Sequence, residues 1–231
     1  MGSRFLDFIR SNEPVLQVAL DFVRTVDAVR LASLLRRELG PVFIAEAGTP
    51  LIKSEGLASV SVLAAVVEPA PVLADMKTAD TGALETGIAG EAGAWASTVL
   101  ASAPDETIAD AVREARRRGM SVVADLIGVR DPVSRAEELA SLGVDVVEVH
   151  VGIDVQRSLG LTAADVRDLV RRVSEKFPGP VAVAGGLRRE TAPSMVEAGA
   201  SVIVVGGAIT KAEDPVEAAR GIIEAIRRPR G

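Results

Sequence analysis

The amino-acid sequence predicts an α/β protein built as a single (β/α)8 TIM barrel. Short apolar segments alternate with amphipathic helical segments, eight such units fit into 231 residues, and glycine ends several helical segments just before the next apolar one. This alternation is typical of parallel strands joined by right-handed crossovers. The alternative is an open, doubly wound sheet. Such a sheet usually carries a glycine-rich nucleotide loop after its first strand, where this chain has Asp21-Phe22-Val23.

The eight expected strands are short and almost wholly apolar. They span residues 15–21, 41–46, 71–75, 95–100, 121–126, 145–150, 180–185 and 201–206. Apolar residues at three-to-four spacing predict helices between them, clearest at 26–39, 134–143, 163–177 and 215–228. Left-handed caps are expected at Gly40, Gly93, Gly119, Gly143 and Gly199. Residues 1–14 would form an N-terminal arm or helix, and 15–231 the barrel catalytic domain.

Composition excludes several classes of function. The net charge of −6 argues against a general nucleic-acid binder. The arginine clusters at 116–118 and 227–230 follow helical segments, where they complement the helix dipole. No apolar run is long enough to predict a membrane span. The chain has no cysteine, which rules out thiolate chemistry and suits a cytoplasmic protein.

Ionisable side chains gather at one end of the predicted barrel. Barrel active sites lie at the C-terminal ends of the strands. Of the first six strands, all but the fourth end in an ionisable group. The ionisable residues, in strand order, are Asp21, Glu46, Asp75 with Lys77, Asp125 and His150. Charges are costly to bury unless they pair or bind something. The pattern therefore predicts an active site at this rim.

Glu46 and Asp75 end neighbouring strands, so their carboxylates can converge on one cation. Two hard oxygen ligands are the usual protein contribution to a Mg²⁺ site, and Mn²⁺ is the other candidate. Alternatively, one or both carboxylates pair with Lys77 or Lys53. Zinc does not suit the sequence, because cysteine is absent and His150 is the single histidine.

Lys77 and His150 are two further candidate catalytic residues. As an ammonium among carboxylates, Lys77 would stabilise a developing oxyanion. As a neutral amine it would form a Schiff base, although the nearby acids favour the ammonium. His150 suits proton transfer because histidine titrates near neutral pH. Each residue also has a purely structural alternative.

Two glycine pairs follow strands seven and eight: Gly185-Gly186 and Gly206-Gly207. Loops at this place in a barrel often bind phosphate through backbone N–H groups. Glycine lets the backbone approach the anion closely. The pairs predict a phosphate site, with tight turns as the alternative.

The motif Asp75-x-Lys77-x-x-Asp80, together with Asp21, resembles the orotidine 5′-monophosphate decarboxylase superfamily. Within it, several stretches look like the 3-hexulose-6-phosphate synthase family: EAGTPLIKSEG (46–56), ADMKTADTGALE (74–85), DLIGV (125–129), EVHVGIDVQ (148–156), AVAGGL (182–187) and VVGGAIT (204–210). The resemblance covers residues 15 to 220.

The resemblance implies a role for each of these residues. Glu46 and Asp75 would hold Mg²⁺, and Asp21 and Lys77 would bind the sugar oxygens. Asp80 would reach into the neighbouring subunit's site, so that a homodimer shares its active sites. The remaining roles would be proton transfer by His150, assistance from Asp125, and phosphate binding by Gly185, Gly186, Gly206 and Gly207.

The reaction implied by the resemblance is a reversible aldol addition. Formaldehyde and the phosphorylated pentulose D-ribulose 5-phosphate would give the hexulose D-arabino-hex-3-ulose 6-phosphate through a cis-enediolate stabilised by Mg²⁺. The main alternative is 3-keto-L-gulonate-6-phosphate decarboxylase, whose pattern has arginine where this chain has Ile153 and glutamate where it has Asp125. Orotidine 5′-phosphate decarboxylase, ribulose-phosphate epimerase and a non-catalytic phosphosugar-binding barrel fit the residues less well.

Overall fold

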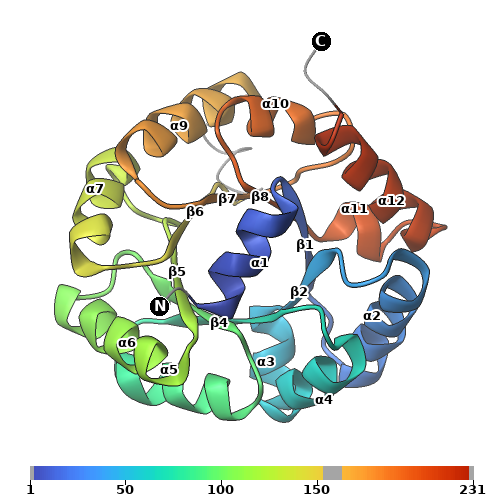
Figure 1. Ribbon diagram of the computed structural model, residues 1–231, viewed down its shortest axis with the longest axis horizontal. Coiled ribbons are helices and arrows are strands. Elements are labelled where there is room, and N and C mark those ends of the chain that lie inside the picture. The colour runs from blue at the N-terminus through green and yellow to red at the C-terminus, as the bar shows by residue number, and fades with distance from the viewer. Residues whose placement is uncertain (1–2, 153–162, 229–231) are drawn as a thin grey trace.

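The computed structural model describes residues 3–152 and 163–228 and contains a closed, all-parallel barrel of eight strands in sequence order. Figure 1 looks down the barrel, with the helices forming a ring outside it. All eight predicted strands are confirmed, with ends that agree to within three residues. The strands are β1 (Val15–Leu20), β2 (Phe43–Ala47), β3 (Val72–Thr78), β4 (Ala96–Leu100), β5 (Ser121–Asp125), β6 (Val146–His150), β7 (Val181–Ala184) and β8 (Val202–Val205).

The helices lie between the strands and bury their apolar faces against the barrel. They are α2 (Thr25–Leu39), α3 (Thr49–Glu55), α4 (Ala58–Val67), α5 (Gly82–Glu91), α6 (Asp105–Arg118), α7 (Pro132–Leu142), α9 (Ala163–Lys176), α10 (Ala192–Glu197), α11 (Gly207–Thr210) and α12 (Pro215–Ile226). The four clearest predicted helices are confirmed as α2, α7, α9 and α12. All five predicted glycine caps have positive φ, but Gly40 combines it with an extended ψ of −171° instead of the left-handed helical value.

Residues before β1 form a helix, α1 (Arg4–Asn12), which lies across the N-terminal end of the barrel (Figure 1). Phe5, Leu6 and Ile9 are buried among the residues that fill the barrel interior. The Ser3 hydroxyl accepts a hydrogen bond from the Leu6 N–H at 3.2 Å and caps the helix. Since α1 fills this end, the cavity described below opens only toward the C-terminal ends of the strands within the part of the chain that the structure describes.

Both faces of each strand are buried, one against the helix ring and the other inside the barrel. On β6, Val146, Glu148 and His150 alternate with Val147 and Val149, so each set shares one face. The Val146 set belongs to the interior and the Val147 set to the layer between strands and helices. Among the described residues, no helix is both long and apolar enough to cross a membrane.

Candidate active site

A cavity of about 820 Å³ lies at the C-terminal ends of the strands. Its walls include nine of the eleven residues that the sequence indicated: Asp21, Glu46, Asp75, Lys77, His150, Gly185, Gly186, Gly206 and Gly207. Asp125 lies directly beneath this surface, fully buried and bonded to Lys77. The structure therefore gathers ten of the predicted residues into one site, and Asp80 alone lies elsewhere.

Lys77 occupies the centre of the charged cluster. Its Nζ donates to the Asp125 Oδ2 at 2.8 Å and to the Asp75 carboxylate at 3.0 Å. Burial acts against the ammonium, but these two carboxylates outweigh it and raise the pKa of Lys77. The backbone of Lys77 is left-handed, with φ 47°, and its N–H is held by the Thr98 hydroxyl at 2.9 Å. A permanent ammonium here favours oxyanion stabilisation over Schiff-base chemistry.

Asp75 is held by three donors. Besides Lys77, the Thr98 hydroxyl donates to its Oδ1 at 2.8 Å and the Thr49 hydroxyl donates to its Oδ2 at 2.6 Å. The side chain is only 5% exposed. The pairing with Lys77 that the sequence left open is thus present, and it fixes the direction of the carboxylate.

Glu46 has no lysine partner among the described contacts. Its Oε2 accepts a hydrogen bond from the Gln17 side-chain amide at 2.8 Å, deep in the barrel. Burial, and then the negative charge of Asp75, raise the pKa of Glu46 to about 8. Two buried carboxylates that repel each other across neighbouring strands are a donor set that fits a hard divalent cation.

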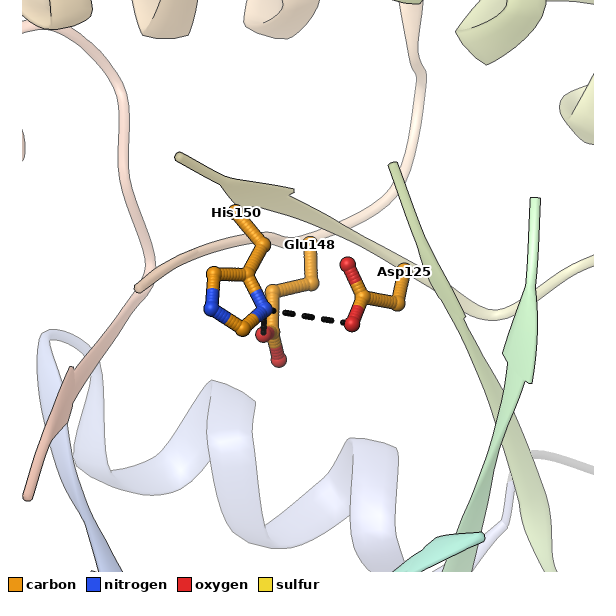
Figure 2. A group of neighbouring side chains, drawn as sticks. All are labelled: Asp125, Glu148 and His150. Atoms are coloured by element: carbon orange, nitrogen blue, oxygen red, sulfur yellow. Dashed lines mark hydrogen bonds and ion pairs between the residues drawn. The ribbon is translucent and has the colours of Figure 1, made fainter. Parts of the chain in front are cut away.

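Asp125, Glu148 and His150 form a second cluster, drawn in Figure 2, where the ring of His150 faces both carboxylates. The His150 Nδ1 lies 3.1 Å from the Asp125 Oδ2 and 3.4 Å from the Glu148 Oε1. Their ligand atoms are close enough together for a cation, but the Lys77 ammonium already lies 2.8 Å from Asp125. We therefore assign this cluster to orienting His150, not to a metal.

The two acids of this cluster have opposite pKa shifts. Burial opposes ionisation of Asp125, but the hydrogen bond to His150 and the charge of Lys77 outweigh it and lower the pKa. Burial, together with the charges of Asp125 and Glu46, raises the pKa of Glu148 well above its ordinary value. Asp125 is thus the ionised partner of His150, and Glu148 holds a proton more readily.

Asp21 follows β1 at the mouth of the cavity. It packs so closely on Gly48 that a Cβ there would lie 2.1 Å from its Oδ1, so a side chain at position 48 would displace the Asp21 carboxylate. Partial burial and the charge of Asp75 raise the pKa of Asp21. Asp21 therefore lies within electrostatic reach of the cluster, as the sequence suggested.

The two glycine pairs lie on the β7–β8 side of the cavity, where a Cβ on Gly206 would be 3.5 Å from the Asp21 Oδ2. Gly185 and Gly186 have φ values of 115° and 68°, which side-chain-bearing residues rarely adopt. Gly206 and Gly207 connect β8 to the short helix α11. Four glycines therefore line this side of the cavity and leave their backbone accessible, which is the arrangement expected for binding an anion.

Asp80 does not join the cavity of its own chain. It is exposed in the turn before α5, where its Oδ1 accepts a hydrogen bond from the Thr81 N–H at 2.7 Å. Nearby on α5, Leu84 and Ile88 are exposed one helical turn apart. Ile153, which the sequence used to separate the synthase from the decarboxylase, lies outside the described residues.

Five polar residues of the site escaped the sequence-based prediction: Gln17, Thr49, Thr98, Glu148 and Arg188. Glu148 is two residues before His150 on β6, so the alternation of a strand places both on one face. The same spacing relates Gln17 to Asp21 through Ala19, and Thr98 lies on the strand that the sequence took as neutral. Counting back two residues from His150 and four from Asp21, in steps of two along the strand, was the signal that would have found Glu148 and Gln17.

The fold and the site define the class of protein: a TIM barrel with a cavity lined by ionisable residues at the C-terminal ends of its strands. A sequence model of the Orotidine 5′-phosphate decarboxylase / HUMPS family matches residues 14–222. The chain belongs to this family.

Individual relatives agree with this assignment. A 3-hexulose-6-phosphate synthase of Mycobacterium gastri is 46% identical over 214 residues, which is 91% of this chain and 99% of the relative. A crystal structure of a 3-hexulose-6-phosphate synthase superposes with a TM-score of 0.85 at 43% identity, covering 92% of this chain and 99% of the other. A 3-keto-L-gulonate-6-phosphate decarboxylase structure from Vibrio cholerae has a TM-score of 0.82 at 29% identity, covering 93% and 97%.

Proposed function

We infer that this protein is a 3-hexulose-6-phosphate synthase, an aldehyde-lyase that interconverts D-ribulose 5-phosphate plus formaldehyde and D-arabino-hex-3-ulose 6-phosphate. The observation that carries the inference is 46% identity to the Mycobacterium gastri synthase over almost the whole of both chains. The site supplies what the reaction needs: a proton-transfer residue, a fixed ammonium and a pair of buried carboxylates.

His150 is the residue that we propose moves the proton. Asp125 and Glu148 hold its Nδ1, which leaves Nε2 for exchange with the substrate. In the synthetic direction, His150 would take a proton from C1 of the pentulose, giving a cis-enediolate. Carbon C1 would then form a bond to the carbon of formaldehyde, and the new alkoxide would take the proton back from His150.

The Lys77 ammonium would stabilise the negative charge of the enediolate, and Asp21 would accept hydrogen bonds from the sugar hydroxyls. Glu46 and Asp75 would hold a Mg²⁺ or Mn²⁺ ion. When bound, such an ion would add Lewis-acid stabilisation of the same charge. Because the bonds from Thr49, Thr98 and Gln17 orient both carboxylates, the chain positions them before the cation arrives.

The first experiment is to measure consumption of formaldehyde with D-ribulose 5-phosphate, with Mg²⁺ and then with EDTA. We expect consumption that stops on chelation and returns when Mg²⁺ is restored. Release of CO₂ from 3-keto-L-gulonate 6-phosphate, without formaldehyde consumption by folded protein, would instead favour the decarboxylase. Activity that persists in EDTA would reject the metal assignment.

We also propose a homodimer in which Asp80 completes the site of the partner subunit. Asp80 is exposed and outside its own cavity, and the exposed Leu84 and Ile88 beside it supply an apolar surface. We expect inactive Asp80→Ala and inactive His150→Ala to regain activity when mixed. In each heterodimer of the two variants, one of the two sites would contain both an unchanged His150 and an unchanged Asp80. Absence of rescue despite proven subunit exchange would reject shared sites. A cytoplasmic location, expected from the sequence, is part of this proposal and is tested by cell fractionation.

A further inference from the structure

The cavity wall formed by β7, β8 and the loops after them differs from the rest in charge. Its described residues are small or apolar with one exception, Arg188: they are Ala184, Gly185, Gly186, Leu187, Val204, Gly206, Gly207 and Ala208. All four carboxylates that line the cavity come from β1, β2, β3 and β6. Arg188 is therefore the single charged side chain on the glycine side among the described lining residues.

The backbone of Arg188 is fixed although its side chain is exposed. Leu187 is buried beside it. The Arg188 N–H donates to the Thr191 hydroxyl at 3.1 Å, and the Arg188 carbonyl accepts from the N–H groups of Thr191 and Ala192 at 3.0 and 2.9 Å. The guanidinium has one described ion-pair partner, Glu190, at 3.3 Å, and both side chains are about two-thirds exposed. Such an exposed ion pair contributes little to the free energy of folding, so a bound anion can replace Glu190 as the partner of the guanidinium.

The cavity needs a cation at this place if it is to bind a phosphorylated sugar. A phosphate monoester carries close to two negative charges at neutral pH, and it would enter a cavity lined by four carboxylates. Lys77 is already bonded to Asp75 and Asp125. Lys53 lines the β2 side, on α3. The Lys211 side chain also approaches Gly207, but among the described residues that line the cavity Arg188 is the cation on the glycine side. A guanidinium binds phosphate oxygens in a bidentate manner.

We propose that Arg188 binds the terminal phosphate of the substrate and makes the site selective for phosphorylated sugars. This inference rests on the proposed function, since it assigns the charged partner of the phosphate in the same cavity. The glycine N–H groups hold the phosphate from below, and the guanidinium supplies the charge from the rim. Arg188 therefore contributes binding energy that an unphosphorylated sugar cannot use.

Arg189 provides a matched control. It is the next residue, also exposed, but it turns away from the cavity: its guanidinium lies against α12, where a Cβ on Gly221 would be 3.0 Å from its Nη1. It does not line the catalytic cavity. Arg188→Ala and Arg189→Ala therefore remove the same charge from adjacent positions, and only the first should affect the phosphate.

The test compares Arg188→Ala, Arg188→Lys, Arg189→Ala and the unchanged protein. We expect Arg188→Ala to lower kcat/KM for D-ribulose 5-phosphate by roughly 10- to 100-fold, mostly through KM, as for other charge-assisted hydrogen bonds. The residual rate with unphosphorylated D-ribulose should not change. Arg188→Lys should recover part of the loss, and Arg189→Ala should match the unchanged protein.

Calorimetric titration with D-ribose 5-phosphate, compared with D-ribose, separates this inference from the proposed function because it needs no turnover. Weaker binding of D-ribose 5-phosphate in Arg188→Ala alone supports the inference even if no formaldehyde is consumed. Unchanged binding in an active enzyme overturns it while the proposed function stands. An equal loss in Arg189→Ala, or an equal loss with D-ribulose, also overturns it.

Discussion

The two sides of the barrel interior are built differently. Strands β1 to β6 each place at least one buried polar side chain inside the barrel, and these include Gln17, Glu46, Asp75, Thr98, Asp125 and Glu148. Strands β7 and β8 place only Ala182, Ala184, Val202 and Val204 there, and then continue into the glycine pairs. One side thus presents side-chain charges, and the other presents backbone.

This difference separates two tasks. On the polar side, hydrogen bonds and ion pairs link the charged groups, so changing one should alter the chemical step. On the glycine side, four glycines line the cavity and leave room for a ligand, so a change should alter binding. Three substitutions test whether this division holds.

The largest effect is expected from Asp75→Asn. It removes the charge that Lys77, Thr49 and Thr98 all hold, and it leaves the ammonium with one partner fewer. We expect kcat to fall by about 10³-fold, similar to the loss of a strong transition-state stabiliser. Formaldehyde consumption measures the rate, and circular dichroism checks that the barrel is folded.

The control for this variant is Asp110→Asn, which removes a carboxylate that is paired with Arg113 on the surface of α6. It should retain full activity. An Asp75→Asn protein with near-normal kcat would show that the polar side does not carry the chemistry.

A smaller effect, on the other side, is expected from Gly186→Ala. A side chain at φ 68° costs about 1–2 kcal/mol of stability and displaces backbone that lines the cavity. We expect KM for D-ribulose 5-phosphate to rise about tenfold with kcat little changed. Steady-state kinetics and urea unfolding measure the two effects.

Gly119→Ala is the matched control, because Gly119 also has φ 68° and caps α6, where an added Cβ meets no other atom. Both variants should lose similar stability, but only Gly186→Ala should change KM. If KM rises equally in both, the effect is a general loss of stability and the glycine side has no special role in binding.

The smallest effect is expected from Glu148→Gln, and it is a change in the free energy of unfolding. The folded state raises the pKa of Glu148, so the folded protein binds this proton more tightly than the unfolded chain does. Stability is therefore lost as pH rises above the ordinary glutamate pKa of about 4.3. Glutamine does not ionise, so the free energy of unfolding of the variant should be higher by about 1 kcal/mol at neutral pH. This difference should vanish at about pH 4.

Urea unfolding at both pH values measures this gain. Glu224→Gln, on the exposed face of α12, should give no such pH-dependent difference. A Glu148→Gln protein that is less stable at neutral pH would mean that the ionised carboxylate is needed, and that the pair with His150 outweighs burial.

Much of the fold was predictable because its signals are local. A short apolar run predicts a strand, whichever strands it later pairs with. A glycine ends a helix because its own backbone can adopt a positive φ. The rim charges were predictable for a related reason: parallel strands all end at one edge, so residues such as Asp21 and His150 must meet once the barrel closes.

The polar residues below the rim were harder to predict. Both faces of a barrel strand are buried, so a single Thr98 or Glu148 in an apolar strand does not reveal which face it occupies. Counting back from a rim residue indicates the face but not the partner. Asp80 presents the opposite case: its motif groups it with Asp75 and Lys77, yet the turn after β3 leaves it on the surface.

The sequence by itself determined the eight strands, the order of the helices and the identity of the charges at the rim, because each depends on a residue and its near neighbours. Only the tertiary structure decided that Lys77 lies between Asp75 and Asp125, that Gln17 holds Glu46, and that Arg188 faces the cavity while Arg189 does not. The contacts of Lys77 with Asp125 and of Gln17 with Glu46 join different strands, and closure of the barrel sets the distances between them.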